Sequence, residues 1–264
     1  MKTSRKHPLL KWLLVLLIGV PVLHYAGRVF VADRFHISGV SMAPTLTAGQ
    51  RVWANKLLMG PRIYTKFDFS DGDLKCIRLP GVRKLRVGDV AAFNCPYGRG
   101  GDSIAFKINY VYCKRCWGVP GDTLLIADGR LVGGGDFQDR IGKGTKADEF
   151  MDFLASALPE KASLQAGNFA GEEEHWTLRD FGPIVVPKRG MTVALDSVAL
   201  RHYGRAIDWE RRCAGSDSEK VSGSIYTFRQ DWYFFVGDNF LNSWDSRHFG
   251  FVPADFVVGI VPNK

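Results

Sequence analysis

The feature that most constrains this chain is a single uninterrupted apolar segment close to its N-terminus. Residues 12–27 read WLLVLLIGVPVLHYAG and carry no formal charge. Four basic residues precede the segment: Lys2, Arg5, Lys6 and Lys11. A basic head before an apolar run is typical of a cleaved signal peptide or of an uncleaved membrane anchor. A membrane-spanning helix needs about 17 to 25 residues, and Leu9 and Leu10 extend the run toward that length.

The residues that follow the apolar segment favour the uncleaved anchor. Cleavage of a signal peptide requires small residues in an A-x-A-like pattern. A cut after Ala26 would place His24 three residues before the bond, and a cut after Ala32 would place Phe30 there. We therefore expect one transmembrane helix within residues 1–31. The basic head should stay in the cytoplasm, so that the rest of the chain lies on the other side of the membrane.

The composition of the remainder indicates a globular protein. The chain has 264 residues, of which 46% are hydrophobic and 23% are charged, and these values exclude a wholly disordered, collagen-like or multi-pass membrane protein. The net charge is +8, but four of the basic residues belong to the N-terminal head. Because no cluster of Lys and Arg is interleaved with aromatic residues, we expect no nucleic-acid partner.

Short apolar runs bounded by Gly and Pro predict a mainly β fold. Strands are expected at residues 90–96, 106–113 and 123–129, and residues 226–239 read as a β-hairpin. A polar stretch from residue 133 to about residue 180 interrupts this pattern. It holds one segment with helical spacing of apolar residues, 147–158.

These shifts in pattern predict three parts in the chain. The first is the basic head and anchor, residues 1–31. The second is a main β domain made from residues 32–128 and 228–264. The third is an inserted second domain, residues 129–227, which contains the short helix.

The cysteines of the chain are expected to be structural. There are five, and Cys113 and Cys116 form a C-x-x-C pair that could be a redox pair or half of a metal site. No second pair or histidine cluster accompanies them, so we expect no metal. Within a strand their side chains would point to opposite faces. A disulfide among some of the five is the remaining alternative.

Three further motifs hold residue types that a hydrolase could use. Residues 38–46 read SGVSMAPTL, residues 114–122 read KRCWGVPGD and residues 237–247 read GDNFLNSWDSR. Taken singly they are explained as a turn serine, an edge lysine and a turn with an Asp–Arg pair. A lysine becomes a general base only when it is neutral, and its free pKa is about 10.4. The apolar residues around Lys114 would lower that pKa by burial.

Together with Gly88-Asp89-Val90, these motifs resemble the type I signal peptidases, a family of membrane-anchored Ser/Lys endopeptidases. The resemblance extends from the anchor to Val252-Pro253 and covers about half of the chain. It implies a Ser–Lys peptidase β-fold without a cofactor. It also implies a single-pass protein of the bacterial cytoplasmic membrane with its catalytic domain on the extracytoplasmic side. The implied partners are the lipid bilayer and the signal peptides of exported preproteins, cleaved after small residues.

The resemblance also implies roles for individual residues. Ser41 is the nucleophile, Lys114 is the general base and Ser243 orients the lysine amine. The oxyanion and supporting residues include Gly39, Asp245, Arg247 and Arg115. The residues that would line the small pockets for the substrate positions one and three before the cut are Phe35, Ile37, Met42, Leu46 and Cys113.

The chain departs from the family pattern in three places. Gly39 stands where some members carry a serine or threonine whose hydroxyl helps to form the oxyanion hole. Phe240 stands where arginine is usual, and Cys113 replaces a commoner aliphatic residue. Two alternatives remain open: a dedicated pilin- or conjugation-type Ser–Lys peptidase, and a non-catalytic anchored scaffold. Intact Ser41, Lys114 and Ser243 argue against the scaffold.

Overall fold

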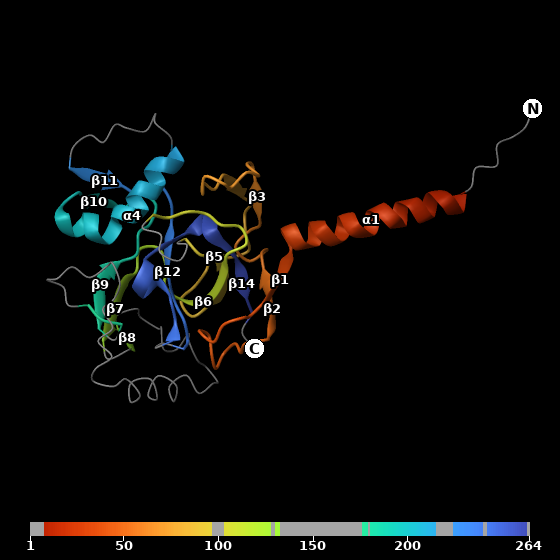
Figure 1. The fold of residues 1–264 in the computed structure, drawn as a ribbon. Helices are drawn as coiled ribbons and strands as arrows, with labels where there is room; N and C mark the ends of the chain where they lie inside the picture. The colour runs from red at the N-terminus through yellow and green to blue at the C-terminus, as the bar shows by residue number, and fades with distance from the viewer. Residues whose placement is uncertain are drawn as a thin grey trace, which may run out of the picture.

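The computed structural model describes residues 8–96, 103–127, 130–132, 176–178, 180–214, 224–239 and 242–262. Its first element is the long helix α1, Pro8–Phe30, which projects away from the folded body (Figure 1). Residues Trp12–Phe30 have a mean hydropathy of 1.9 and are not buried against the rest of the chain. By length and composition this helix is a candidate membrane span, as the apolar segment predicts.

A seven-stranded antiparallel sheet forms the centre of the body, in the order β1-β2-β14-β5-β6-β12-β13. The bounds of its strands are β1 Ala32–His36, β2 Arg51–Asn55, β5 Val90–Asn94, β6 Val111–Gly118, β12 Trp232–Val236, β13 Val252–Pro253 and β14 Val257–Val261. The C-terminal strand β14 pairs with both β2 and β5. The sheet therefore joins the two ends of the folded body, and the expectation of a mainly β fold is confirmed.

The sheet is buried on both faces because successive side chains of its central strands enter two different cores. On β5, Ala91 and Phe93 belong to the larger core, whereas Val90 and Ala92 belong to the smaller one. Cys116 likewise packs in the larger core, and Cys113 packs against the smaller one. The two thiols thus lie on opposite faces, as predicted, and none of the five cysteines forms a disulfide.

The remaining elements surround this sheet. Strands β7 Thr123–Ala127, β8 Arg130–Val132 and β9 Phe181–Val185 form a three-stranded sheet. Two-stranded sheets are made by β3 Arg62–Tyr64 with β4 Cys76–Arg78 and by β10 Thr192–Ala194 with β11 Ile225–Thr227. Besides α1, the described residues form the helix α4 Ser197–Ala214, the short α5 Ser246–Phe249 and the 3-10 turn Ala254–Phe256.

Two local predictions are wrong. Residues 226–239 do not form a hairpin, because β11 pairs with β10 whereas β12 pairs with β6 and β13. The connecting segment is held by Glu210 of α4, whose carboxylate accepts hydrogen bonds from the backbone amides of Arg229 and Gln230. The strand expected at 106–113 begins only at Val111, since Phe106 is buried among core aromatic rings.

The structure also bears on the proposed second domain. The predicted boundary at residue 128 puts β7 in the main domain and puts β8 and β9 in the second domain. In the structure β7 pairs with both β8 and β9. Ile184 of β9 and Ile207 of α4 share the larger core with Phe235 of the central sheet. The two parts therefore share one core, and the division into domains remains a prediction. The helix expected at 147–158 lies outside the described residues.

Candidate active site

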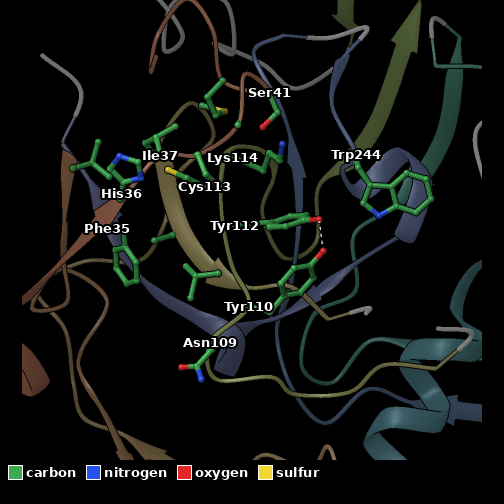
Figure 2. A pocket seen from close by; sticks show the side chains of 16 residues that line it. Phe35, His36, Ile37, Ser41, Asn109, Tyr110, Tyr112, Cys113, Lys114 and Trp244 are labelled. Carbon is green, nitrogen blue, oxygen red and sulfur yellow. Dashed lines mark hydrogen bonds between the residues drawn. The ribbon is translucent and has the colours of Figure 1, made fainter. Parts of the chain in front are cut away.

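Lys114 and Ser243 meet in the interior of the protein. Lys114 lies in the middle of β6 and is only 3% exposed. Its Nζ donates a hydrogen bond of 3.1 Å to Oγ of Ser243, which lies between β12 and α5. Ser41 lies in the turn-rich segment after β1, and Figure 2 shows its hydroxyl and the Lys114 amine directed toward one another. The three predicted residues are therefore gathered at one place.

The environment of Lys114 favours its neutral form. Burial lowers the pKa of Lys114 to about 8, although the negative charge of Asp245 opposes this effect. Tyr112, two residues earlier on the same face of β6, places its ring centroid 5.5 Å from Nζ. At a mildly alkaline pH a lysine in this position is partly neutral and can accept a proton. An exposed lysine is already protonated at that pH and cannot.

Residues 237–247, the third motif, hold residues 38–46, the first motif, in place through hydrogen bonds to backbone carbonyls. The Asn239 amide donates to the Ser41 carbonyl at 3.0 Å, and the Asn239 side chain donates to the Val40 carbonyl at 3.1 Å. Gly237 permits this approach, because a Cβ there would lie 2.2 Å from Ser243 Oγ and 2.5 Å from the Ser41 carbonyl oxygen. The position of the serine relative to Ser243 thus depends on a glycine at residue 237.

Asp245 and Arg247 form a fully buried ion pair behind the site. Arg247 donates to the Asp245 carboxylate from Nε at 2.9 Å and from Nη2 at 2.8 Å. The same carboxylate accepts from the Gly237 amide at 3.0 Å and caps the start of α5. Burial alone would raise the pKa of Asp245, but Arg247 and His248 hold it well below its usual value. The pair fixes the loop that carries Ser243.

Arg115 makes a different ion pair. Its guanidinium donates to Asp238 from Nε at 2.8 Å and from Nη2 at 2.5 Å, and Nη1 donates to the Gly88 carbonyl at 2.8 Å. Arg115 therefore connects the third motif to the segment that carries Gly88. The sequence reasoning did not select Asp238. The signal was present, because a buried arginine requires a carboxylate and Asp238 lies in the same set of motifs.

A cavity of about 400 Å³ opens beside Ser41 and Lys114 (Figure 2). Five of the residues predicted to contact substrate or to form the oxyanion region line this cavity. They are Phe35, Ile37, Gly39, Met42 and Cys113. Leu46 is described but is not among the lining residues; it is buried in the smaller core beneath the cavity.

Other lining residues were not anticipated from the sequence. They include His36, Asn109, Tyr110, Tyr112 and Trp244. The hydroxyls of Tyr110 and Tyr112 lie 2.9 Å apart and form one wall of the cavity (Figure 2). Tyr112 could have been found, because residues two apart on a strand share a face and Lys114 was already assigned to the site.

A comparison with known families identifies the family to which the chain belongs. A family model described as signal peptidase, peptidase S26, matches residues 9–262, which is nearly the whole chain. The chain belongs to this family. It is an enzyme, a signal peptidase, and the resemblance carried by the sequence motifs is confirmed.

Three signal peptidases of Bacillus species are similar to the chain. "Signal peptidase I P" of Bacillus subtilis subsp. natto is 29% identical over 70% of this chain and 71% of that protein. "Signal peptidase I" of Bacillus licheniformis is 25% identical, over 84% and 89% of the two chains. "Signal peptidase I" of Bacillus caldolyticus is 26% identical, over 89% and 79%.

Gly39 gives this signal peptidase a testable peculiarity. A Cβ added at residue 39 would meet nothing within 4 Å, so a side chain can be accommodated there. We expect Gly39→Ser to raise kcat, because one side-chain donor in an oxyanion hole is typically worth about 100- to 1000-fold. The measurement is kcat on an A-x-A peptide, with Gly39→Ala as the control that adds a Cβ without a donor. Equal rates for the serine and alanine variants would contradict a missing donor.

Proposed function

We propose that this chain is a membrane-bound serine endopeptidase that cleaves signal peptides after small residues by means of a Ser–Lys dyad. The observation that carries the proposal is the buried Lys114 amine, which is hydrogen-bonded to Ser243 and directed toward the Ser41 hydroxyl. A serine hydroxyl is a weak nucleophile unless a neighbouring base removes its proton. Among the groups around Ser41, the lysine with a lowered pKa is suited to that task.

The proposed reaction proceeds in two steps. In the first, neutral Lys114 takes the proton of Ser41, whose Oγ attacks the carbonyl carbon of the scissile bond. The resulting oxyanion is stabilised by backbone N–H groups. The Lys114 ammonium then gives its proton to the departing amine, which leaves an ester on Ser41. In the second step Lys114 activates a water molecule that hydrolyses this ester.

The side chains along the cavity support the expected preference for small residues. Phe35, Ile37 and Met42 occupy its wall, and all three are large apolar side chains. Apolar walls favour apolar substrate side chains over polar ones, and we propose that the space between these walls beside Ser41 takes alanine-sized groups. Cys113 lies at the same end of the cavity in Figure 2. We propose that this end binds the substrate residues one and three positions before the cut.

We also propose that α1 anchors the protein in the bacterial cytoplasmic membrane, with its N-terminus in the cytoplasm. This proposal rests on the apolar helix and on the basic residues that precede it. Alkaline phosphatase fused to the C-terminus should be active, and the purified protein should retain residue 1 or 2 at its N-terminus. An N-terminus near residue 27 or 33 would contradict an uncleaved anchor.

The pH dependence of cleavage should follow the Lys114 amine. Since the neutral amine is the active form and burial brings its pKa to about 8, kcat/KM should rise with pH and level off above that value. An unburied lysine would place the rise near pH 10.4. The measurement is kcat/KM for one peptide between pH 6 and 10. A profile that is flat through pH 8 would argue against Lys114 as the base.

Cleavage of a preprotein with an A-x-A site by the full chain in detergent tests the proposed function. We expect one cut after the second alanine, identified by sequencing the new N-terminus, and loss of that cut in Ser41→Ala. A dedicated pilin-type peptidase would leave ordinary preproteins intact and cleave only its own substrate. A non-catalytic scaffold would cleave neither.

A further inference from the structure

One end of the cavity is formed by an exposed tryptophan that the proposed reaction does not use. Trp244 lines the cavity and is 54% exposed, yet both of its neighbours in sequence are buried. Ser243 accepts the hydrogen bond from Lys114, and Asp245 pairs with Arg247 and caps α5. The backbone on either side of Trp244 is therefore held in place.

The indole ring is also held in place. It stacks on the ring of His248, with 4.6 Å between the centroids and 26° between the planes. His248 in turn accepts a hydrogen bond from the Asp245 amide at 3.3 Å through Nδ1. A fixed aromatic surface binds a ligand side chain with little further loss of conformational entropy. Ligand-binding cavities are lined mainly by apolar and aromatic side chains, and Trp244 lines this one.

The position of Trp244 in the cavity places it near the part of the substrate that follows the scissile bond. Figure 2 shows Phe35 and Ile37 toward one end of the cavity and Trp244 at the other, with Lys114 between them. In the proposed reaction the residues before the cut lie at the Phe35 end. The scissile carbonyl must lie beside Ser41 and the departing amine beside Lys114. The chain beyond the cut then continues toward Trp244.

We infer that Trp244 is a specificity-determining residue that binds the first side chain after the cut, and that it favours an apolar one. This inference rests on the proposed function. An apolar side chain gains free energy by covering the exposed indole. A basic side chain is disfavoured, because Lys114 becomes an ammonium during the reaction. Trp244 thus selects the N-terminal residue of the mature protein.

Two peptides that differ only in the first residue after an A-x-A site test this inference. The wild-type enzyme should show a kcat/KM about fivefold higher for leucine than for glycine at that position, the effect of partly burying one apolar side chain. In Trp244→Ala the ratio should fall toward one, and in Trp244→Phe most of it should remain. The matched control is Trp53→Ala, since Trp53 is 55% exposed on β2 and is not among the described residues that line the cavity.

The possible results separate the inference from the proposed function. If wild-type enzyme cleaves neither peptide, the proposed function fails and the inference fails with it. If cleavage occurs but the leucine-to-glycine ratio is near one, or persists in Trp244→Ala, the inference alone is overturned. An equal fall for both peptides in Trp244→Ala also overturns it, because this would show that Trp244 supports the fold or contacts lipid.

Discussion

Replacing Lys114 with arginine should abolish cleavage as completely as replacing it with alanine. Arginine keeps the positive charge and much of the bulk, but its guanidinium stays protonated and cannot act as a base. We expect kcat/KM to fall by about 10⁴-fold or more in both variants, as for other nucleophile–base pairs that act as a unit. The measurement is hydrolysis of an A-x-A peptide at a pH above 8.

Lys107→Ala is the control for this comparison. Lys107 is exposed, and its backbone carbonyl accepts hydrogen bonds from the Asn94 side chain and the Tyr110 amide. Removing its amine should leave kcat/KM close to the wild-type value. A comparable loss in Lys107→Ala would show that the assay responds to lysine charge in general instead of to Lys114.

The second large effect concerns the stability of the buried pair. Asp245→Asn should lower the free energy of unfolding by about 3–5 kcal/mol, because the Arg247 cation is left buried without its carboxylate. Asparagine remains a good N-cap, so the start of α5 is preserved and the charge is the main change. For a chain of this size the loss corresponds to a fall in Tm of about 10 °C, measured by circular dichroism.

Two further variants identify the cause of that loss. Adding Arg247→Met to Asp245→Asn should recover part of the stability, because it removes the unpaired cation. Lys84→Met should change the free energy of unfolding by less than about 1 kcal/mol, since the Lys84–Asp231 pair is 3.6 Å long and lies at the surface. If Asp245→Asn is no less stable than Lys84→Met, the buried pair does not hold the loop.

The sequence predicted that Ser41 and Lys114 belong to one site because each motif combines short-range signals. Ser41 and Lys114 were assigned by motif resemblance and by the apolar surroundings of the lysine, and the structure brings them to one cavity. The partner of Arg115 was missed because pairing between distant segments depends on the fold. Arg115 and Asp238 are 123 residues apart in sequence, and only the pairing of β6 with β12 brings them together.

For the fold as well, some elements that depend on local sequence were predicted, whereas pairings that depend on tertiary contacts were not. Strands β5 and β7 were expected from their apolar runs and occur at those places. The 226–239 segment was misread because two strand-like runs close in sequence predict a hairpin, whereas tertiary contacts place them in different sheets. Helix α4 was missed, although Ala199, Tyr203 and Ile207 have helical spacing and are buried.

The most direct test of the Ser–Lys mechanism compares Ser41→Ala, Lys114→Arg and the double variant on one A-x-A peptide. If Ser41 and Lys114 act as a unit, removing the second group costs nothing once the first is lost. The account predicts the same residual kcat/KM for all three proteins. Near wild-type activity in Lys114→Arg, or a double variant much weaker than either single variant, would show that Lys114 is not the base for Ser41.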